Sequence, residues 1–443
     1  MRLLGLHTFR HGVHPPEAKD ETSGLAIRQF PFAPLLVVPL VQHIGAPARA
    51  VVRDGQEVMR GQRIADPDGF MSVAMHAPAS GVVRRVALAP SISGRMVPAV
   101  YLAPHPGSTQ EVAEGVPCPL DASPAEIVAA IQAAGVVGLG GAGFPTHVKL
   151  RIPEGKSVDT LIINGVECEP YLTTDHRVML EQRDDVFMGI RYLLRVSGAQ
   201  RAIIGVEANK PDAAAHLRDG LPADLPASVQ VLRVKYPQGA EKLLISALLG
   251  REVPSGGLPV DVRALCVNVA TTAEIGRLLP HGRGIQERIV TIGGPAVRRK
   301  GNYRVPIGTP LRFLLDEVGV TGDVNRVFLG GPMMGAAASS LEITVTKGVS
   351  GVIAFTDHEA ERAARQPFPC IRCGYCLDAC PMFLDPAMLG ALARTEDFPR
   401  MRDEFHLLDC FECGACSFVC PAHIPLAQQF RLAKAALRKT TAH

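Results

Sequence analysis

The sequence lacks any long apolar run. Its 443 residues contain no apolar stretch of the roughly 18 residues that a membrane-spanning helix needs. The best candidate, residues 32–41 (FAPLLVVPLV), is interrupted by two prolines. The opening MRLLGLHTFRHG also lacks the long apolar core of a secretory signal. We therefore expect a cytosolic protein that does not itself cross a bilayer.

Strong charge of one sign is also missing. The formal net charge is +3, with 47% hydrophobic and 20% charged residues and no long biased tract. An excess this small does not indicate nucleic-acid binding, so we expect no nucleic-acid partner. The composition is that of a globular protein, and the length suffices for about two to four domains.

Disulfides are not expected either, although the chain has 11 cysteines. The cytosol keeps thiols reduced, and clustered cysteines in that compartment more often bind metal. Three cysteines stand outside the clusters. We expect Cys118 and Cys266 to be core residues, and Cys168 is the third.

The remaining cysteines form two groups with the same spacing, C-x2-C-x2-C-x3-C followed by proline. This spacing is typical of two-cluster ferredoxins, in which the fourth cysteine of each group ligates the other cluster. Structural zinc instead uses paired C-x2-C knuckles without a third cysteine at fixed spacing. Because all eight thiolates are used, both clusters transfer single electrons and leave no iron open to a substrate. The predicted ligand sets are Cys370, Cys373, Cys376 and Cys420 for one 4Fe-4S cluster, and Cys410, Cys413, Cys416 and Cys380 for the other.

A glycine-rich stretch, residues 138–150 (GLGGAGFPTHVKL), has the G-x-G-x-x-G order of many dinucleotide sites. A Rossmann fingerprint needs a strand before the loop, but here a predicted helix over residues 124–134 ends at Gly135, just before it. A surface turn is therefore the alternative. The loop nevertheless suits a flat, phosphorylated ligand, because glycines allow close backbone approach. Pro145 and Thr146 can begin a helix whose N-terminus attracts anions, and Lys149 adds positive charge.

Acidic and amide side chains follow the next predicted strand. Asn164, Glu167 and Glu169 stand in the sequence NGVECEP, where they can contact ribitol, ribose or amide groups. The alternative for the two glutamates is a solvated loop. Alternating strands and helices over residues 116–285 predict a parallel sheet whose ligand lies at the carboxyl ends of the strands.

The chain divides into four predicted domains, which together make a multidomain α/β protein. Residues 1–115 have short strands and turns that resemble a biotinyl/lipoyl-type β barrel-sandwich, without a lysine at the hairpin tip to carry a group. Residues 116–285 form a Rossmann-like domain. Residues 286–350 resemble the soluble-ligand-binding β-grasp module, and residues 351–443 form an α-helical two-cluster ferredoxin domain.

The motifs GxGGAGFPTxxKL and N-x-x-E-x-E-P resemble those of the flavin- and NADH-binding subunit of respiratory complex I and its hydrogenase relatives. The chain is similar nearly end to end to the RnfC family, one of the subunits of the Rnf ion-translocating ferredoxin:NAD oxidoreductase complex. That similarity includes HGVHPPE (11–17), NGVECEPYLTT (164–174), KYPQGAEK (235–242), FLGGPMMG (328–335) and both cysteine groups.

The resemblance implies noncovalently bound FMN with NADH stacked on it, and no separate catalytic side chain. The third flavin contact of the complex I motif has two consecutive asparagines, where this chain has Val267 and Asn268. The implied contacts are Gly138, Gly140, Gly141, Ala142, Gly143, Phe144 and Lys149 in the loop, Asn164, Glu167 and Glu169 after the strand, Tyr236 and Glu241 near the nicotinamide, and Asn268 and Thr271 as the third flavin contact.

The implied function is electron transfer between NAD(H), FMN and the two clusters, because a flavin exchanges electrons both in pairs and singly. The implied partners are the membrane subunits of an Rnf-type complex, which move sodium or protons, and an iron–sulfur partner subunit. The implied location is peripheral, on the cytoplasmic side of the bacterial inner membrane. The alternatives are a soluble flavin-dependent corrinoid reductase and a flavin-free iron–sulfur conduit.

Two further stretches carry expectations. Residues 426–439 form a predicted helix whose basic residues we expect to be solvated, with contact to an acidic partner or lipid headgroups as the alternative. His11 and His14 flank a turn beside two prolines and are expected to be turn residues rather than metal ligands.

Overall fold

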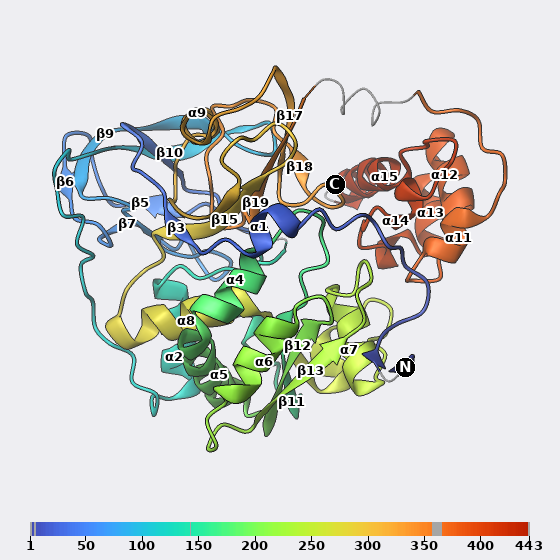
Figure 1. The fold of residues 1–443 in the computed structure, drawn as a ribbon, viewed down its shortest axis with the longest axis horizontal. Helices are drawn as coiled ribbons and strands as arrows, with labels where there is room; N and C mark the ends of the chain where they lie inside the picture. Colours follow the sequence, from blue (N-terminus) through green and yellow to red (C-terminus); the bar gives the residue numbers. More distant parts are fainter. Residues whose placement is uncertain (1, 4–5, 142, 357–365, 442–443) are drawn as a thin grey trace.

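The computed structural model describes residues 2–3, 6–141, 143–356 and 366–441. The β-rich N-terminal part lies beside the β-grasp sheet, and the helical cluster domain lies at the opposite end (Figure 1). The first residues of the chain add strands β1 (Arg2–Leu3) and β2 (Leu6–His7) to the central sheet and β3 (Arg28–Gln29) to the β-grasp sheet. The multidomain α/β fold class expected from the sequence is confirmed. No helix in these residue ranges is long and apolar enough to cross a membrane.

A six-stranded sheet with a parallel centre forms the middle of the molecule. Its strand order is β1-β2-β13-β12-β11-β14, and β11, β12, β13 and β14 pair in parallel. Their carboxyl ends therefore meet at one edge, as the alternating sequence predicted. The strand bounds are β1 Arg2–Leu3, β2 Leu6–His7, β11 Thr160–Gly165, β12 Arg201–Glu207, β13 Ala227–Leu232 and β14 Ala264–Asn268.

Helices cover both faces of this sheet because side chains alternate along each strand. Leu161 and Ile163 join one large apolar core, and Ile162 joins a second core on the opposite face. Residues of α2, α5, α6 and α8 contribute to the first core and residues of α7 to the second. The helix bounds are α2 Pro124–Ala133, α4 Thr174–Glu181, α5 Arg183–Ser197, α6 Pro211–Asp219, α7 Glu241–Leu249 and α8 Val269–Leu278.

The helix before the glycine loop begins and ends as its sequence predicts. Ser123 and Glu126 form a capping box at the start of α2, and Gly135 follows its end with φ of 73°, the left-handed region that glycine tolerates. The helix after the loop is α3, Thr146–Lys149, with four residues. A helix of one turn adds little dipole, so an anion at this loop depends on the loop's own N–H groups.

Two β domains lie beside the central sheet. The N-terminal domain has a four-stranded sheet, β4-β10-β9-β6, and a three-stranded sheet, β5-β7-β8. The β-grasp domain has the order β18-β17-β19-β15-β16-β3, with α9 packed on it. The bounds are β3 Arg28–Gln29, β4 Leu36–Pro39, β5 Arg49–Ala50, β6 Glu57–Val58, β7 Arg63–Asp66, β8 Met75–His76, β9 Gly81–Pro90, β10 Met96–Pro104, β15 Glu287–Gly293, β16 Gly301–Pro306, α9 Leu311–Val318, β17 Val324–Leu329, β18 Ala336–Ala337 and β19 Gly351–Thr356.

The cluster domain is a set of short helices with an apolar core of its own, which includes Leu389, Met401 and Phe430. Its longest element is α15, Leu426–Thr441, which confirms the predicted C-terminal helix. The other bounds are α11 Tyr375–Ala379, α12 Pro386–Arg394, α13 Phe398–Asp403 and α14 Ala415–Phe418.

An N-terminal segment, residues 11–19, connects the cluster domain with the central sheet (dark blue in Figure 1). Gly12 N–H donates to the Ala379 carbonyl at 3.1 Å, and Val13 pairs with Tyr236. A side chain at Gly12, where φ is 82°, would lie 2.6 Å from the Tyr236 carbonyl oxygen, so this close approach requires glycine. The segment then enters α1, Asp20–Ser23, above α4.

Candidate functional site

A cavity of about 570 Å³ lies at the carboxyl ends of the parallel strands. It is lined by every described residue of the predicted FMN and NADH set, from Gly138 to Thr271. Ala142 lies outside the described residues. Segments far apart in the sequence thus converge on one site, and the size is that of typical small-molecule and cofactor pockets.

The glycine loop forms one wall and is fixed by the protein behind it. Leu139 N–H donates to Thr271 Oγ1 at 2.9 Å, and the Arg288 guanidinium donates to the Leu139 carbonyl at 2.7 Å. A Cβ at Gly140 would lie 2.4 Å from Asn268 Nδ2, whereas a Cβ at Gly141 would meet nothing within 4 Å. The loop is therefore packed on its inner side and open at Gly141, as a backbone cradle for a flat ligand must be.

The two glutamates after β11 do not form a solvated loop, which corrects that alternative. Glu167 is buried, and its carboxylate accepts hydrogen bonds from Thr174 Oγ1 at 3.0 Å and Asp175 N–H at 2.8 Å. The Glu169 carboxylate accepts from the N–H groups of Met333 and Met334 at 3.0 and 2.7 Å. Burial raises the pKa of Glu169, and these two N–H groups oppose that shift. Both side chains hold the wall in shape.

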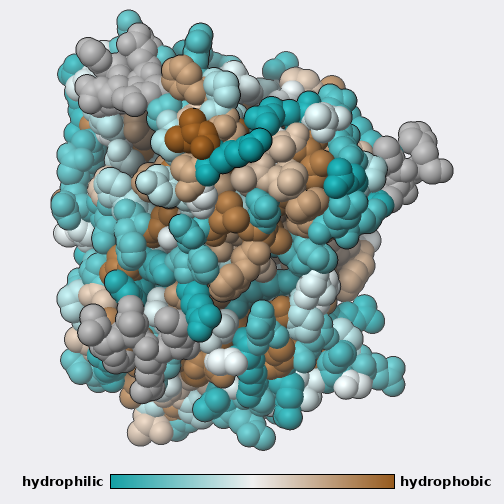
Figure 2. All heavy atoms as spheres, turned by 90° about the vertical axis from the view of Figure 1, so that its right-hand side faces the viewer, coloured by the Kyte–Doolittle hydropathy of each residue, from teal (hydrophilic) through white to brown (hydrophobic). Residues whose placement is uncertain are grey.

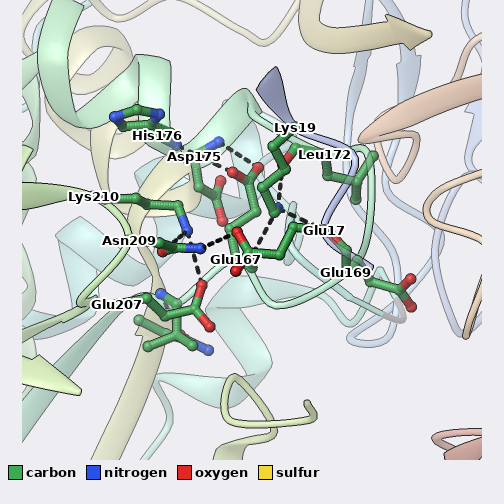
Figure 3. A network of polar contacts seen from close by, with 12 residues as sticks. Glu17, Lys19, Glu167, Glu169, Leu172, Asp175, His176, Glu207, Asn209 and Lys210 are labelled. Atoms are coloured by element: carbon green, nitrogen blue, oxygen red, sulfur yellow. Dashed lines mark hydrogen bonds and ion pairs between the residues drawn. The ribbon is translucent and has the colours of Figure 1, made fainter. Parts of the chain in front are cut away.

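Lys19 fixes the same loop from the N-terminal segment. Its buried ammonium donates to the carbonyls of Glu167, Glu169 and Leu172 at 2.8, 2.9 and 2.5 Å. Figure 3 shows the Lys19 side chain reaching into the curve of this loop, next to Glu167. Burial lowers the pKa of Lys19, with Glu167 opposing. Nothing in the local sequence marks Lys19 as part of the site, because its partners are about 150 residues away.

Two asparagines end neighbouring strands at the cavity. Asn164 Nδ2 donates to the Gly239 carbonyl at 2.8 Å, and Asn268 Oδ1 accepts from Thr271 N–H at 3.1 Å, where it caps α8. Asn268 Nδ2 donates to Asp175 Oδ2 at 2.7 Å. Asp175 also lines the cavity and was not predicted. Burial first, and then the nearby Glu167 carboxylate, raises the pKa of Asp175 to about 7.

Lys149 and Glu241 form an ion pair of 2.5 Å across the cavity wall. Burial is the largest single effect and favours the neutral amine, but the charge and hydrogen bond of Glu241, together with Cys266, outweigh it and raise the pKa of Lys149. The positive charge expected from Lys149 is thus matched by an acid at the start of α7. Phe144, at the other end of the loop, exposes 37% of its surface.

Tyr236 joins the cavity to the cluster domain. Its hydroxyl donates to the Cys413 carbonyl at 2.6 Å, and the residue is almost fully buried. The hydroxyl is therefore engaged with a predicted cluster ligand.

The cysteines gather in the two crossed sets that the spacing predicted. Cys380, Cys410, Cys413 and Cys416 line one small cavity, and Cys370, Cys373, Cys376 and Cys420 line another. Within the described ranges, no three His, Cys, Asp or Glu side chains are close enough to hold a single metal ion. Each set instead surrounds a hollow, and its four thiols match the donors that a 4Fe-4S cube uses.

Burial makes these sites unfavourable for bare thiolates. Burial, with Cys410 and Cys380 adding, raises the pKa of Cys413 to about 12. The pKa of Cys376 is raised to about 11, by burial first. A bound cation reverses this preference, because metal coordination deprotonates thiols outright. The residues present therefore fit iron–sulfur clusters.

The large cavity and the cavity of the first cysteine set share a wall. Cys410, Phe411 and Cys413 line the cluster cavity of the first set, and Cys410 and Phe411 also line the large cavity, with Leu408 and Asp409. No local signal in the sequence predicted these contacts, because they arise from domain packing.

Of the remaining expectations, the burial of two cysteines is confirmed and the solvated face of the last helix is wrong in part. Cys118 and Cys266 are buried as predicted, and Cys168 lines the large cavity. His11 Nδ1 hydrogen-bonds the Asp378 carbonyl at 2.7 Å. The expected solvated basic face of the last helix is wrong in part, because Arg431 and Lys434 both pair with Glu412 at 3.1 Å.

Comparisons with known proteins agree with this layout. Four family models match in chain order: the RnfC barrel sandwich hybrid domain (7–105), the Nuo51 FMN-binding domain (131–277), the SLBB domain (289–337) and the 4Fe-4S dicluster domain (368–424). The chain is 40% identical over 439 residues to the C-subunit of the proton-translocating ferredoxin:NAD(+) oxidoreductase complex of Clostridium ljungdahlii, covering 98% of this chain and 94% of the relative. The chain belongs to the RnfC family.

Other members are similar over much of this chain. The C-subunit of the Na(+)-translocating ferredoxin:NAD(+) oxidoreductase complex of Acetobacterium woodii is 39% identical, with 86% of each chain covered. The C-subunit of the ion-translocating oxidoreductase complex of Pseudomonas aeruginosa is 40% identical over 99% of this chain and 56% of its own length. A crystal structure of an NAD+-reducing NiFe hydrogenase is similar at 19% identity and a TM-score of 0.48, covering 76% of this chain and 67% of that chain.

Membership and the matched domains establish the cofactors. This RnfC-type chain is an oxidoreductase subunit that carries FMN and two 4Fe-4S clusters. The large cavity, with its open glycine cradle, fits the flavin, and the two cysteine sets fit the clusters.

Proposed function

We propose that this chain is the NADH- and FMN-binding electron-transfer subunit of an Rnf-type ion-translocating oxidoreductase, peripheral on the cytoplasmic side of the bacterial inner membrane. The single observation that carries the electron path is that Cys410, a cluster ligand, lines both the flavin cavity and a cluster cavity. Relatives named as subunits of ferredoxin:NAD(+) oxidoreductase complexes support the reaction class.

The cavity residues bind and orient. The N–H groups of the glycine loop are available to phosphate and ring oxygens, and Asn164 and Asn268 border the same cavity from two strand ends. FMN supplies the conversion between a two-electron hydride and single electrons. The Phe144 ring, which is 37% exposed, offers apolar surface for a nicotinamide or adenine ring.

The cysteine sets define the proposed route. Electrons pass between the cavity and the cluster of Cys380, Cys410, Cys413 and Cys416, and then the cluster of Cys370, Cys373, Cys376 and Cys420. The second set contains the exposed Cys370 and Cys373, whereas Cys413 and Cys416 of the first are buried. The outer cluster is therefore the exit to a partner.

The surface around the exposed cysteines supports a protein partner there. Phe368, Ile371 and Tyr375 expose 63%, 67% and 57% of their surface. Figure 2 shows hydrophobic side chains gathered over the face on which the cluster domain lies. Several large apolar side chains exposed close together in the sequence, beside the cluster ligands, are what an interaction site offers. We propose that an iron–sulfur partner subunit docks here, and that membrane subunits of the complex perform the ion translocation.

Anaerobic NADH titration of the reconstituted chain, followed by absorbance and EPR, tests the proposal. We expect bleaching of a bound flavin together with an iron–sulfur EPR signal. Iron and acid-labile sulfide without flavin absorption or NADH response would instead indicate the flavin-free conduit. Co-purification with membrane subunits separates the proposal from a soluble corrinoid reductase.

A further inference from the structure

Asp175 lines the flavin cavity but is not among the residues expected to contact the flavin or NADH. It lies in the first turn of α4, it is buried at 7% exposure, and it lines the cavity beside Thr174. Its Oδ2 accepts from Asn268 Nδ2, and Asn268 in turn touches the inner side of the loop at Gly140. A carboxyl in this position is within the shell of side chains that surrounds the ligand.

A second, smaller pocket lies behind the loop that follows β11 and carries Glu167. Its volume of about 60 Å³ is enough for water, whose share of liquid volume is about 30 Å³. It is lined by polar side chains that include His14, Glu17, Glu207 and Lys235. Glu167, Cys168 and Tyr236 line both this pocket and the large cavity. The Glu167 side chain thus separates the two spaces.

A group of linked polar side chains lies at this pocket, and the charge of its Lys210 acts on Asp175. Asn209 donates to Glu17 at 2.7 Å, Lys210 donates to Asn209 at 3.0 Å, and Lys210 pairs with Glu207 at 2.8 Å. The Lys210–Glu207 pair is almost fully buried, and Glu207 Oε1 has no hydrogen-bond partner in the described protein. Figure 3 shows Asn209, Lys210 and Glu207 close to Glu167 and Asp175.

Burying so many charges costs stability, and such groups cluster at functional sites. The groups that act on Asp175 come from four elements: Glu167 from the loop after β11, Arg288 from β15, Lys210 at the start of α6 and Asn268 at the end of β14. Burial and Glu167 favour the protonated carboxyl, and the other three favour the carboxylate. The first two effects are the larger, so the pKa of Asp175 lies above that of an ordinary aspartate.

Flavin chemistry needs such a group. Reduction by NADH breaks one C–H bond and moves a hydride, which is two electrons and one proton, and the ring takes up one further proton. When the two electrons leave singly for the clusters, both protons must leave. Resting on the proposed function, we propose that Asp175 exchanges protons with the bound flavin, and that Glu167 and the pocket behind it connect Asp175 with solvent.

The test compares the FMN-loaded wild-type chain with Asp175→Asn, and uses Asp224→Asn as the control. Asp224 pairs with Arg191 on the surface, away from the cavity. The midpoint potential of the flavin is measured by spectroelectrochemistry on both sides of pH 7. Above the pKa of Asp175, reduction draws an extra proton onto the carboxyl. The wild-type and control potentials therefore fall more steeply with pH just above that point, by the contribution of the extra proton, and the Asp175→Asn line lacks this steeper segment.

Curves of the same shape for wild type and Asp175→Asn would overturn the inference. If Asp175→Asn does not retain FMN, a second measurement on the wild type tests the role of Asp175. This measurement is the infrared difference spectrum between oxidised and reduced flavin, recorded with and without carbon-13 aspartate. An isotope-sensitive carboxyl band that changes on flavin reduction is expected, and its absence refutes the role. A wild-type chain that binds no FMN refutes the proposed function and the inference together.

Discussion

Gly141 offers the most selective perturbation of the flavin site. A Cβ at this position meets nothing within 4 Å, and the residue is exposed in the cavity wall. Gly141→Phe therefore places a ring in the cavity without displacing protein atoms. Exposed substitutions of this kind change stability by about 0.5 kcal/mol or less. The cost falls on the ligand, which loses its close approach to the backbone.

The expected loss of FMN affinity is at least about a hundredfold, which corresponds to about 2.8 kcal/mol. Isothermal titration of the anaerobic chain with FMN measures it, and iron and sulfide content reports the clusters, which should be unchanged. Gly24→Phe is the matched control, because Gly24 is also open to solvent, with φ of −81° and no atom near its Cβ position. Full flavin occupancy in Gly141→Phe would show that the loop is not the flavin cradle.

Four further substitutions test other parts of the site. Cys370→Ser should remove the outer cluster and leave flavin-to-cluster transfer intact, whereas Cys410→Ser should abolish it. Freeze-quench EPR after NADH mixing distinguishes the two variants, and equal effects would contradict the order in which the Cys410 cluster lies next to the flavin and the Cys370 cluster lies beyond it. Lys19→Met leaves three carbonyls without their donor. We expect a loss of about 1–3 kcal/mol in the free energy of unfolding, measured by denaturant titration, together with weaker FMN binding. Unchanged stability would refute this role of Lys19. Tyr236→Phe removes one hydrogen bond to the Cys413 carbonyl and should cost about 0.5–1.5 kcal/mol with no change in the NADH KM; a raised KM would show that the hydroxyl contacts the nucleotide.

The sequence predicted what local chemistry determines. Cysteine spacing by itself encodes which thiols can share a cube, so both crossed sets followed from it. The Ser123 capping box is likewise a local signal, and the alternating strands and helices placed Asn164 at a strand end. Asn268 was named only through the family resemblance, and its position at the end of the neighbouring strand β14 was not predicted. Family resemblance then supplied the flavin.

Contacts between segments that are far apart in the sequence could not be predicted from local patterns. Lys19 reaches carbonyls on a loop about 150 residues away, and no periodicity marks it. A solvated loop stayed open as an alternative for the glutamates after β11, because the groups that bind them, Thr174 and two methionine N–H groups, are brought to them only by folding. Asp175 had no visible partner in the sequence, because its environment is made by strands that meet only in the folded sheet.

The most direct test of the account is a single-turnover experiment with the chain carrying FMN and both clusters. One equivalent of NADH is mixed anaerobically with the protein, and flavin absorbance and cluster EPR are followed in time. The account predicts flavin bleaching, then reoxidation of the flavin as the clusters become reduced. A dithionite control first establishes that the potential of the clusters is no lower than that of the flavin. If the flavin then stays reduced while the clusters stay oxidised, a direct path through Cys410 is contradicted.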